Sequence, residues 1–103
     1  MSDVEQHRTF TTTIDDARQA AWDALATLGA EVTVSDDGTS LEAKTGWSLF
    51  SFGEVVHVDL QTQGDEVEAT VKSRQNRAQM LDVSRRNHKN VGSVLTAMSA
   101  RLG

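Results

Sequence analysis

The sequence predicts an α+β fold: a two-layer sandwich in which an antiparallel sheet of about five strands carries two helices on one face. Three observations support this prediction. Within residues 31–74, short runs alternate apolar and polar side chains, as half-buried strands do. Residues 17–28 and 82–102 instead repeat their apolar side chains at spacings of three and four, as amphipathic helices do. Short turns with glycine separate neighbouring runs, which favours antiparallel pairing.

The first two elements are a strand and a helix. Residues 7–14 are rich in threonine and isoleucine, whose β-branched side chains favour a pleated surface. Asp15 is the expected N-cap of the helix, and Asp16 places an acid in the first turn, where the helix dipole favours negative charge. The helix covers residues 17–28, with small alanines on its apolar stripe that allow close approach to a sheet. Gly29 is expected to end it.

Four further strands and a second helix follow. The strands are predicted at residues 31–35, 39–45, 54–62 and 66–74. Glycine-containing turns join the first two strands and the last two, since glycine accepts the positive φ of tight turns. After a polar connection at residues 75–81, Asp82 or Ser84 caps the last helix, whose apolar stripe reaches Leu102. The order is therefore β-α-β-β-β-β-α.

Length and composition restrict the class of protein. A chain of 103 residues is expected to form one domain, residues 1–103. The absence of cysteine excludes disulfides, thiolate catalysis and cysteine-ligated metals. No apolar run is long enough for a membrane span, and residues 1–8 lack the basic end and apolar middle of a signal peptide. We therefore expect a soluble, cytoplasmic protein.

The charge is unevenly distributed along the chain. The net charge of −5 disfavours general nucleic-acid binding, because phosphate neutralisation needs clustered cations. Residues 1–64 are acidic overall, whereas residues 65–103 are basic overall. The cations concentrate in residues 72–89, which we call the basic segment; they are Lys72, Arg74, Arg77, Arg85, Arg86 and Lys89. This asymmetry is the main functional signal in the sequence.

The first candidate site is residues 46–53, which we call the aromatic segment. It carries three of the five aromatic residues of the chain, Trp47, Phe50 and Phe52, between two glycines. As a functional surface it would bind a partner protein, a second copy of the chain or an apolar ligand. As a structural element its rings would close the core beneath the helices, which the sequence favours for at least two of them. The glycines suit a bulge or bend in either case.

The second candidate site lies near the start of the last helix. Its residues are Arg74, Arg77, Arg85, Arg86, His88 and Lys89. If they gather at the helix N-terminus, the free backbone N–H groups add to their positive potential, and the place can bind a phosphate or a carboxylate. The alternative is that these cations form a solvated helix face whose positive charge balances the acidic remainder of the molecule. The sequence favours this alternative, because runs of exposed charge usually serve only solvation. No glycine-rich phosphate loop accompanies these cations.

The sequence contains no pattern typical of an enzyme or a metal centre. The three histidines, His7, His57 and His88, are not spaced as metal ligands. His57 and Asp59 share a strand face, but an exposed polar face explains this pair as well as a site does. No nucleophile-elbow motif is present. We therefore expect no catalytic residue, no metal and no cofactor.

The element order and two local motifs resemble known proteins. The order β-α-β-β-β-β-α resembles one half of a TATA-binding-protein-like fold and a shortened helix-grip domain of the START and plant-allergen type. Residues 46–54 and 82–91 resemble motifs of a group of small uncharacterised bacterial proteins of about this length. The helix-grip resemblance implies a ligand enclosed beneath the sheet. TATA-binding protein reads DNA with a basic and apolar sheet face, whereas the open face expected here is acidic and rich in threonine.

The sequence favours recognition rather than catalysis. The leading hypothesis is a non-enzymatic binding or protein-interaction module that uses the aromatic segment and the basic start of the last helix. The second is a small-ligand carrier of helix-grip type, with an apolar or anionic ligand between the sheet and the last helix, where Met80 and Met98 adapt to a pocket. The third is weak nucleic-acid binding through the basic segment, with an affinity that falls steeply with salt.

Overall fold

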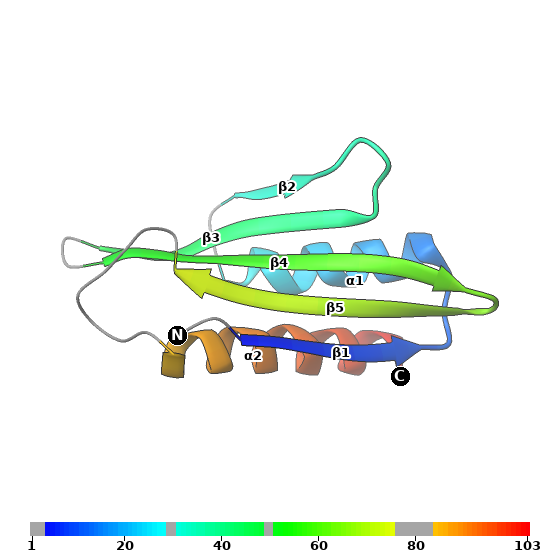
Figure 1. Ribbon diagram of the computed structural model, residues 1–103. Coiled ribbons are helices and arrows are strands. Elements are labelled where there is room, and N and C mark those ends of the chain that lie inside the picture. The colour runs from blue at the N-terminus through cyan, green and yellow to red at the C-terminus, as the bar shows by residue number, and fades with distance from the viewer. Residues whose placement is uncertain (1–3, 29–30, 49–50, 76–83) are drawn as a thin grey trace.

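A computed structural model describes residues 4–28, 31–48, 51–75 and 84–103, and it describes the side chains of these residues except 45–48, 51–53, 75 and 84–86. Over this part of the chain, five strands and two helices follow in the order β-α-β-β-β-β-α (Figure 1). The elements are β1 (Val4–Phe10), α1 (Ile14–Ala26), β2 (Val32–Val34), β3 (Ser40–Ser48), β4 (Ser51–Gln63), β5 (Glu66–Gln75) and α2 (Ser84–Leu102). The predicted fold class and element order are confirmed.

The five strands form one antiparallel sheet in the order β1-β5-β4-β3-β2. Three of the pairings are hairpins between consecutive strands, which the turn residues predict. The fourth joins β1 to β5 and brings Val4 opposite Ser73. It arises because β1 and β2 lie at opposite edges of the sheet and α1 carries the chain from one edge to the other.

Both helices lie on the same face of the sheet (Figure 1). α1 packs against β2, β3 and β4, whereas α2 packs against β1, β4 and β5, and the two helices also contact each other. The opposite face carries no helix among the described residues. The prediction that two helices shield one side of the sheet is therefore confirmed. None of the helices described here is both long and apolar enough to cross a membrane.

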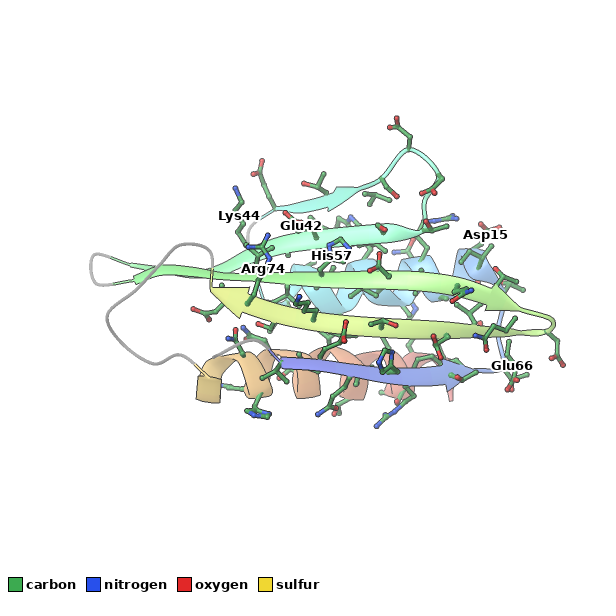
Figure 2. All side chains as sticks on the ribbon, viewed as in Figure 1. Asp15, Glu42, Lys44, His57, Glu66 and Arg74 are labelled. Carbon is green, nitrogen blue, oxygen red and sulfur yellow. The ribbon has the colours of Figure 1, made fainter. Side chains whose placement is uncertain are left out.

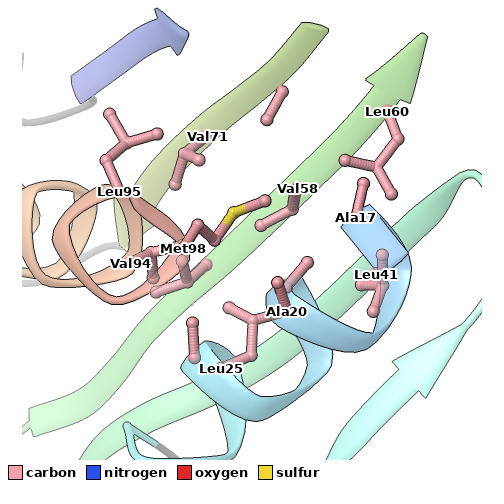
Figure 3. Close-up of a cluster of buried hydrophobic side chains, with 14 of the residues drawn as sticks. Ala17, Ala20, Leu25, Leu41, Val58, Leu60, Val71, Val94, Leu95 and Met98 are labelled. Carbon is pink, nitrogen blue, oxygen red and sulfur yellow. The ribbon is translucent and has the colours of Figure 1, made fainter. Parts of the chain in front are cut away.

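The core lies between the sheet and the two helices (Figure 3). Alternate residues of the central strands point into it, as the period of two requires. These inward residues are Leu41, Ala43, Val56, Val58, Leu60, Val67, Ala69 and Val71, and each is at most 5% exposed. α1 contributes Ala17, Ala20, Ala21 and Ala24, all buried. Because these side chains are short, α1 can pack close to the sheet.

The first strand and the first helix differ from their predicted boundaries. β1 spans Val4–Phe10 rather than residues 7–14. Its pairing ends with Phe10 opposite Val67. β5 begins at Glu66, only one residue before Val67, so the antiparallel partner strand ends there and the threonines after Phe10 have almost no strand to pair with. Thr13, not Asp15, is the N-cap of α1, since its hydroxyl oxygen accepts a hydrogen bond from the backbone N–H of Asp16 at 3.2 Å.

The β3–β4 hairpin is longer than the sequence predicts and includes most of the aromatic segment. Its register continues unchanged from the pair Ser40–Asp59 through Trp47–Phe52 to Ser48–Ser51. An inserted residue would shift this register, so the described pairing contains no bulge; the other possibility given for the glycines, a bend, stays a prediction. Phe50 and the side chains of Trp47 and Phe52 lie outside the described residues. Whether these rings close the core therefore stays a prediction.

The β2–β3 turn is expected to reject a side chain at Gly38. Its φ of 73° strains L-residues, and Nε of Arg18 donates a hydrogen bond to its carbonyl oxygen at 2.7 Å. An added Cβ would lie only 2.6 Å from that Nε. Gly38→Ala should therefore cost about 1 kcal/mol more than Gly64→Ala, because the Arg18 hydrogen bond is lost as well. Gly64 has a φ of 66° and no described atom near the added Cβ. Urea denaturation of both variants measures the difference, and equal losses would show that Arg18 moves aside without cost.

Candidate functional site

Four polar side chains are buried in the apolar layer between the sheet and α2. They are Glu54 of β4, Ser73 of β5, and Asn87 and Asn90 of α2, with exposed fractions of 1%, 0%, 0% and 8%. Among the residues whose side chains are described, these four are the buried polar ones. We call them the buried polar cluster. Burial of polar groups costs free energy unless they are hydrogen-bonded, so their arrangement needs a physical explanation.

The periods of the strands and of the helix bring the cluster together. Glu54 continues the inward row of β4 that contains Val56, and Ser73 continues the inward row of β5 that contains Val71. The sheet register places Ser73 directly opposite Val56, one inward position from Glu54. Asn87 and Asn90 are three residues apart and therefore share one side of α2. The cluster thus lies where the start of α2 covers the end of the core.

The hydroxyl group of Ser73 is at the centre of the hydrogen bonds in the cluster. It donates to Oδ1 of Asn87 at 2.7 Å and accepts from Nδ2 of Asn90 at 3.2 Å. Nδ2 of Asn90 also donates to Oε1 of Glu54 at 3.4 Å. The site therefore combines amide donors, a hydroxyl group and a carboxylate in a space away from water, where hydrogen bonds are stronger than at a surface.

The sequence analysis did not identify this cluster, although two signals for it were present. Asn87 and Asn90 share the apolar stripe of α2 with Val91 and Val94. Glu54 is two residues before Val56, so it occupies the next inward position of the alternating pattern of β4. A polar residue in an inward position of either pattern is a signal of a buried polar site.

Among the predicted cationic residues whose side chains are described, Arg74 lies apart from His88 and Lys89. Arg74 is exposed and lies on the sheet face opposite to the helices (Figure 2), because its neighbour Ser73 points inward. His88 and Lys89 are exposed residues of α2, which packs on the other face. The sheet therefore separates Arg74 from His88 and Lys89. Arg77 and the side chains of Arg85 and Arg86 lie outside the described residues, so the anion-site hypothesis at the helix start stays a prediction.

The open face of the sheet carries a second polar group around His57 (Figure 2). Nε2 of His57 lies 3.0 Å from Oδ1 of Asp59, and Nδ1 lies 3.5 Å from Oε2 of Glu42. The hydroxyl of Ser40 donates to Oδ1 of Asp59 at 2.6 Å. The Asp59 side chain is 57% exposed and that of Glu42 is 42% exposed. Within the described part of the chain, no group of three His, Cys, Asp or Glu residues is arranged to hold a metal ion.

A third feature is an open groove at the other end of α2. It has a volume of about 640 Å³, and Thr11, Thr13, Gln19, Asp65 and Arg101 are among the residues that line it. Arg101 also forms an ion pair with Asp23 of α1. Asn87 and Arg101 are fourteen residues apart on α2, roughly 20 Å along the helix axis. The groove is therefore separate from the buried polar cluster.

Comparisons with known proteins identify the fold. No protein-family model matches the chain, and a search of curated proteins finds no match either. Among solved structures, the chain is similar to the Aha1 dimer from Colwellia psychrerythraea, with a TM-score of 0.66, 10% identity, and coverage of 99% of this chain and 97% of that chain. It is also similar to a START superfamily protein from Mycobacterium smegmatis, with a TM-score of 0.59, 9% identity, and coverage of 97% and 96%.

A third solved structure has a similar fold. The chain is similar to Ara h 8.0201, with a TM-score of 0.53, 11% identity, and coverage of 97% of this chain and 96% of that chain. Identities this low show a shared fold and nothing finer. The TATA-binding-protein-like alternative stays a prediction. The protein is therefore a small α+β domain with a helix-grip-like fold.

Proposed function

We propose that this protein is a non-enzymatic module that binds a small apolar ligand with an uncharged polar group, held between the sheet and α2 at the buried polar cluster. The observation that carries the proposal is the burial of Glu54, Ser73, Asn87 and Asn90 together in an otherwise apolar layer. Well-packed apolar residues at such positions are often at least as stabilising as buried polar ones. A role in recognising a polar ligand group accounts for their presence.

The arrangement of the core supports this end of the α2 layer as the binding place. The alanines of α1 close the space between that helix and the sheet. The β3–β4 hairpin, in contrast, extends beyond the end of α1 (Figure 1). The Trp47–Phe52 pair lies two residues beyond Glu54 along this hairpin. The aromatic segment is thus next to the cluster in the sheet, which suits a ligand with an apolar body.

Met98 gives the α2 layer some capacity to adapt. Its side chain is fully buried in the core beside Val94 and Leu95 (Figure 3). A methionine side chain has three rotatable bonds and can change its packing around a guest more easily than a branched side chain. Met80, which the sequence suggests for the same role, lies outside the described residues.

The chemistry of the cluster favours a neutral ligand over an anionic one. Asn87 and Asn90 offer amide donors, and Ser73 and Glu54 offer oxygen acceptors. A hydroxyl or amide group in the ligand can use both kinds of partner. The oxygen acceptors of Glu54 and Ser73 suit a ligand group that donates a hydrogen bond, and a carboxylate or sulfonate has no donor to offer them.

Two dyes with the same ring system but different charge test the proposal. N-phenyl-1-naphthylamine is neutral and has one N–H donor, whereas 1-anilinonaphthalene-8-sulfonate adds a sulfonate. The neutral dye should bind with enhanced fluorescence. Asn90→Leu should weaken its binding about tenfold, because the side-chain carbonyl oxygen of Asn90, which can accept a hydrogen bond from the dye N–H, is lost. Thr96→Val, at an exposed position of the same helix, is the control and should not change the affinity.

Tighter binding of the sulfonated dye would support the anionic alternative. Equal affinities for wild type and Asn90→Leu would place the ligand elsewhere.

Two other hypotheses remain predictions of the sequence. Protein binding through the aromatic segment depends on side chains outside the described residues. Weak nucleic-acid binding through the basic segment requires its cations to share one surface. The position of Arg74 across the sheet from His88 and Lys89 weighs against such a surface.

A further inference from the structure

The β2 edge of the sheet carries an apolar surface that the proposed ligand site does not use. Trp22 and Val34 are 42% and 37% exposed, and they are the exposed large hydrophobic side chains among the described residues. Val34 is paired with Leu41, whose side chain is buried in the core. Directly opposed residues of an antiparallel pair point to the same side. Val34 therefore emerges on the helix side of the sheet.

Trp22 lies on the side of α1 that faces the β2–β3 hairpin. Arg18, one turn before Trp22, donates a hydrogen bond from Nε to the carbonyl oxygen of Gly38 in the hairpin turn. Residues four apart on a helix share one side, so Trp22 is directed toward the same hairpin. α1 also contacts β2. Trp22 and Val34 are thus both placed on the helix side of the sheet, beside the edge strand.

The two edges of the sheet differ in their protection against further pairing. At the β1 edge, Arg8 donates a hydrogen bond to the hydroxyl of Ser99 on α2 (2.5 Å), and Glu5, Gln6 and His7 are exposed polar residues. β2 has the sequence Val-Thr-Val, with no charge and no proline, and among the described strands β3 is its one neighbour in the sheet. Edge strands are blocked by charges, by prolines or by being very short, and β2 has only the last of these protections. β2 can therefore accept another strand along its three residues.

The other face of this edge is acidic. A pocket of about 230 Å³ lies beside β2, and its lining includes Thr33, Ser40, Glu42 and His57. Glu42 and Asp59 both approach His57 on this face. Exposed acids also flank the strand at its two ends: Glu31, Asp36 and Asp37.

The acid at the end of β2 is stably ionised. Hydrogen bonds from Ser35, and then from the backbone and hydroxyl of Thr39, lower the pKa of Asp37 to about 2. Asp37 is therefore fully charged at neutral pH. Two cations lie nearby: Arg18, which is engaged by Asp15 and by the carbonyl of Gly38, and Lys44, which lies beside Glu42 (Figure 2). The acids around β2 outnumber these two cations, so the edge presents a net negative charge to an approaching chain; they are Glu31, Asp36, Asp37, Glu42 and Asp59.

We infer that β2 is a docking edge for an extended, basic segment of a partner protein, which would add a sixth strand to the sheet. Alternate side chains of a strand point to opposite faces. Apolar residues of the partner would lie against Trp22 and Val34, and its alternate lysines or arginines would face Glu42 and Asp59. Backbone hydrogen bonds to β2 would supply affinity, and the alternating pattern would supply specificity.

A second copy of the chain is a poorer match for this edge. Two-fold pairing of β2 with itself is antiparallel, and it would bring Glu31 of one copy close to Asp36 and Asp37 of the other. Three acids from each copy would then share one small interface. Like charges in such positions oppose association. Charge complementarity therefore favours a basic partner.

A fluorescein-labelled octapeptide of alternating lysine and valine is the probe. It should raise fluorescence anisotropy in the presence of the protein, whereas a lysine–serine octapeptide of equal charge and a glutamate–valine octapeptide should not. Glu42→Lys should weaken binding at least fivefold, and Trp22→Ala should do the same. Glu66→Lys is the matched control, because it makes the same charge change on the same face at a distance from β2 (Figure 2), and it should change affinity by less than twofold. Thermal unfolding curves establish that each variant is folded.

Three results would overturn the inference. One is no binding of the lysine–valine peptide, and another is equal weakening by Glu42→Lys and Glu66→Lys, which would indicate general charge attraction. The third is a concentration-dependent dimer in sedimentation velocity that Trp22→Ala abolishes, which would assign the edge to a second copy. Binding of N-phenyl-1-naphthylamine should be the same in Trp22→Ala and wild type, so this test is independent of the proposed ligand site.

Discussion

Leu25→Ala is expected to lower the free energy of unfolding by about 2–5 kcal/mol, the usual range for a buried leucine. Leu25 is fully buried in the core (Figure 3). The neighbouring inward residues of α1, Ala21 and Ala24, have side chains too short to fill the resulting space. The cavity would remain largely open, so the loss should lie in the upper part of the range. Urea denaturation followed by circular dichroism measures the effect.

Leu102→Ala is the matched control for this substitution. Leu102 is half-buried at the end of α2, beside the open groove, and packs only at the border of the core. Its truncation should cost about 1 kcal/mol, because less apolar surface is removed from the interior and solvent can fill the space. Similar losses for the two leucines would contradict the packing of α1 described here.

Asn87→Leu is expected to lower the free energy of unfolding by about 1–3 kcal/mol, because the buried hydroxyl of Ser73 loses its acceptor. Replacing both partners should cost less than the sum of the two single substitutions. The double variant Ser73→Ala, Asn87→Leu should therefore show a coupling energy of about 1 kcal/mol. Urea denaturation of the four proteins in this cycle gives the value. A coupling energy near zero would show that the two side chains contribute independently and that the cluster is not a connected network.

The sequence predicts the fold well because local periodicity determines most of it. Alternation in residues 66–74 and the three- and four-residue spacing in α1 and α2 correctly predict the type of each element and its buried side. The pairing of β1 with β5 could not be predicted, because it depends on how α1 crosses the sheet. Thr13 was assigned to the first strand because it is β-branched, and so it was not considered as the N-cap. The strand ends earlier because its partner β5 begins at Glu66.

The candidate site could be predicted only in part. The strand alternation that places Lys72 outward also places Arg74 outward, so the sequence already contained the reason why Arg74 is separated from the α2 cations. The buried polar cluster needed knowledge of the sheet register, because Ser73 and Glu54 come from different strands and meet Asn87 and Asn90 only in the folded chain. Isolated polar residues at inward positions carry too little information to show which of them meet.

The most direct test of ligand binding at the buried polar cluster is a ¹H–¹⁵N correlation spectrum recorded with and without N-phenyl-1-naphthylamine. The largest shifts should occur in the side-chain amide signals of Asn87 and Asn90, while backbone signals of the open sheet face should change little. Largest shifts at the groove formed by Thr11, Thr13 and Arg101, with the two asparagine signals unchanged, would contradict the proposed site.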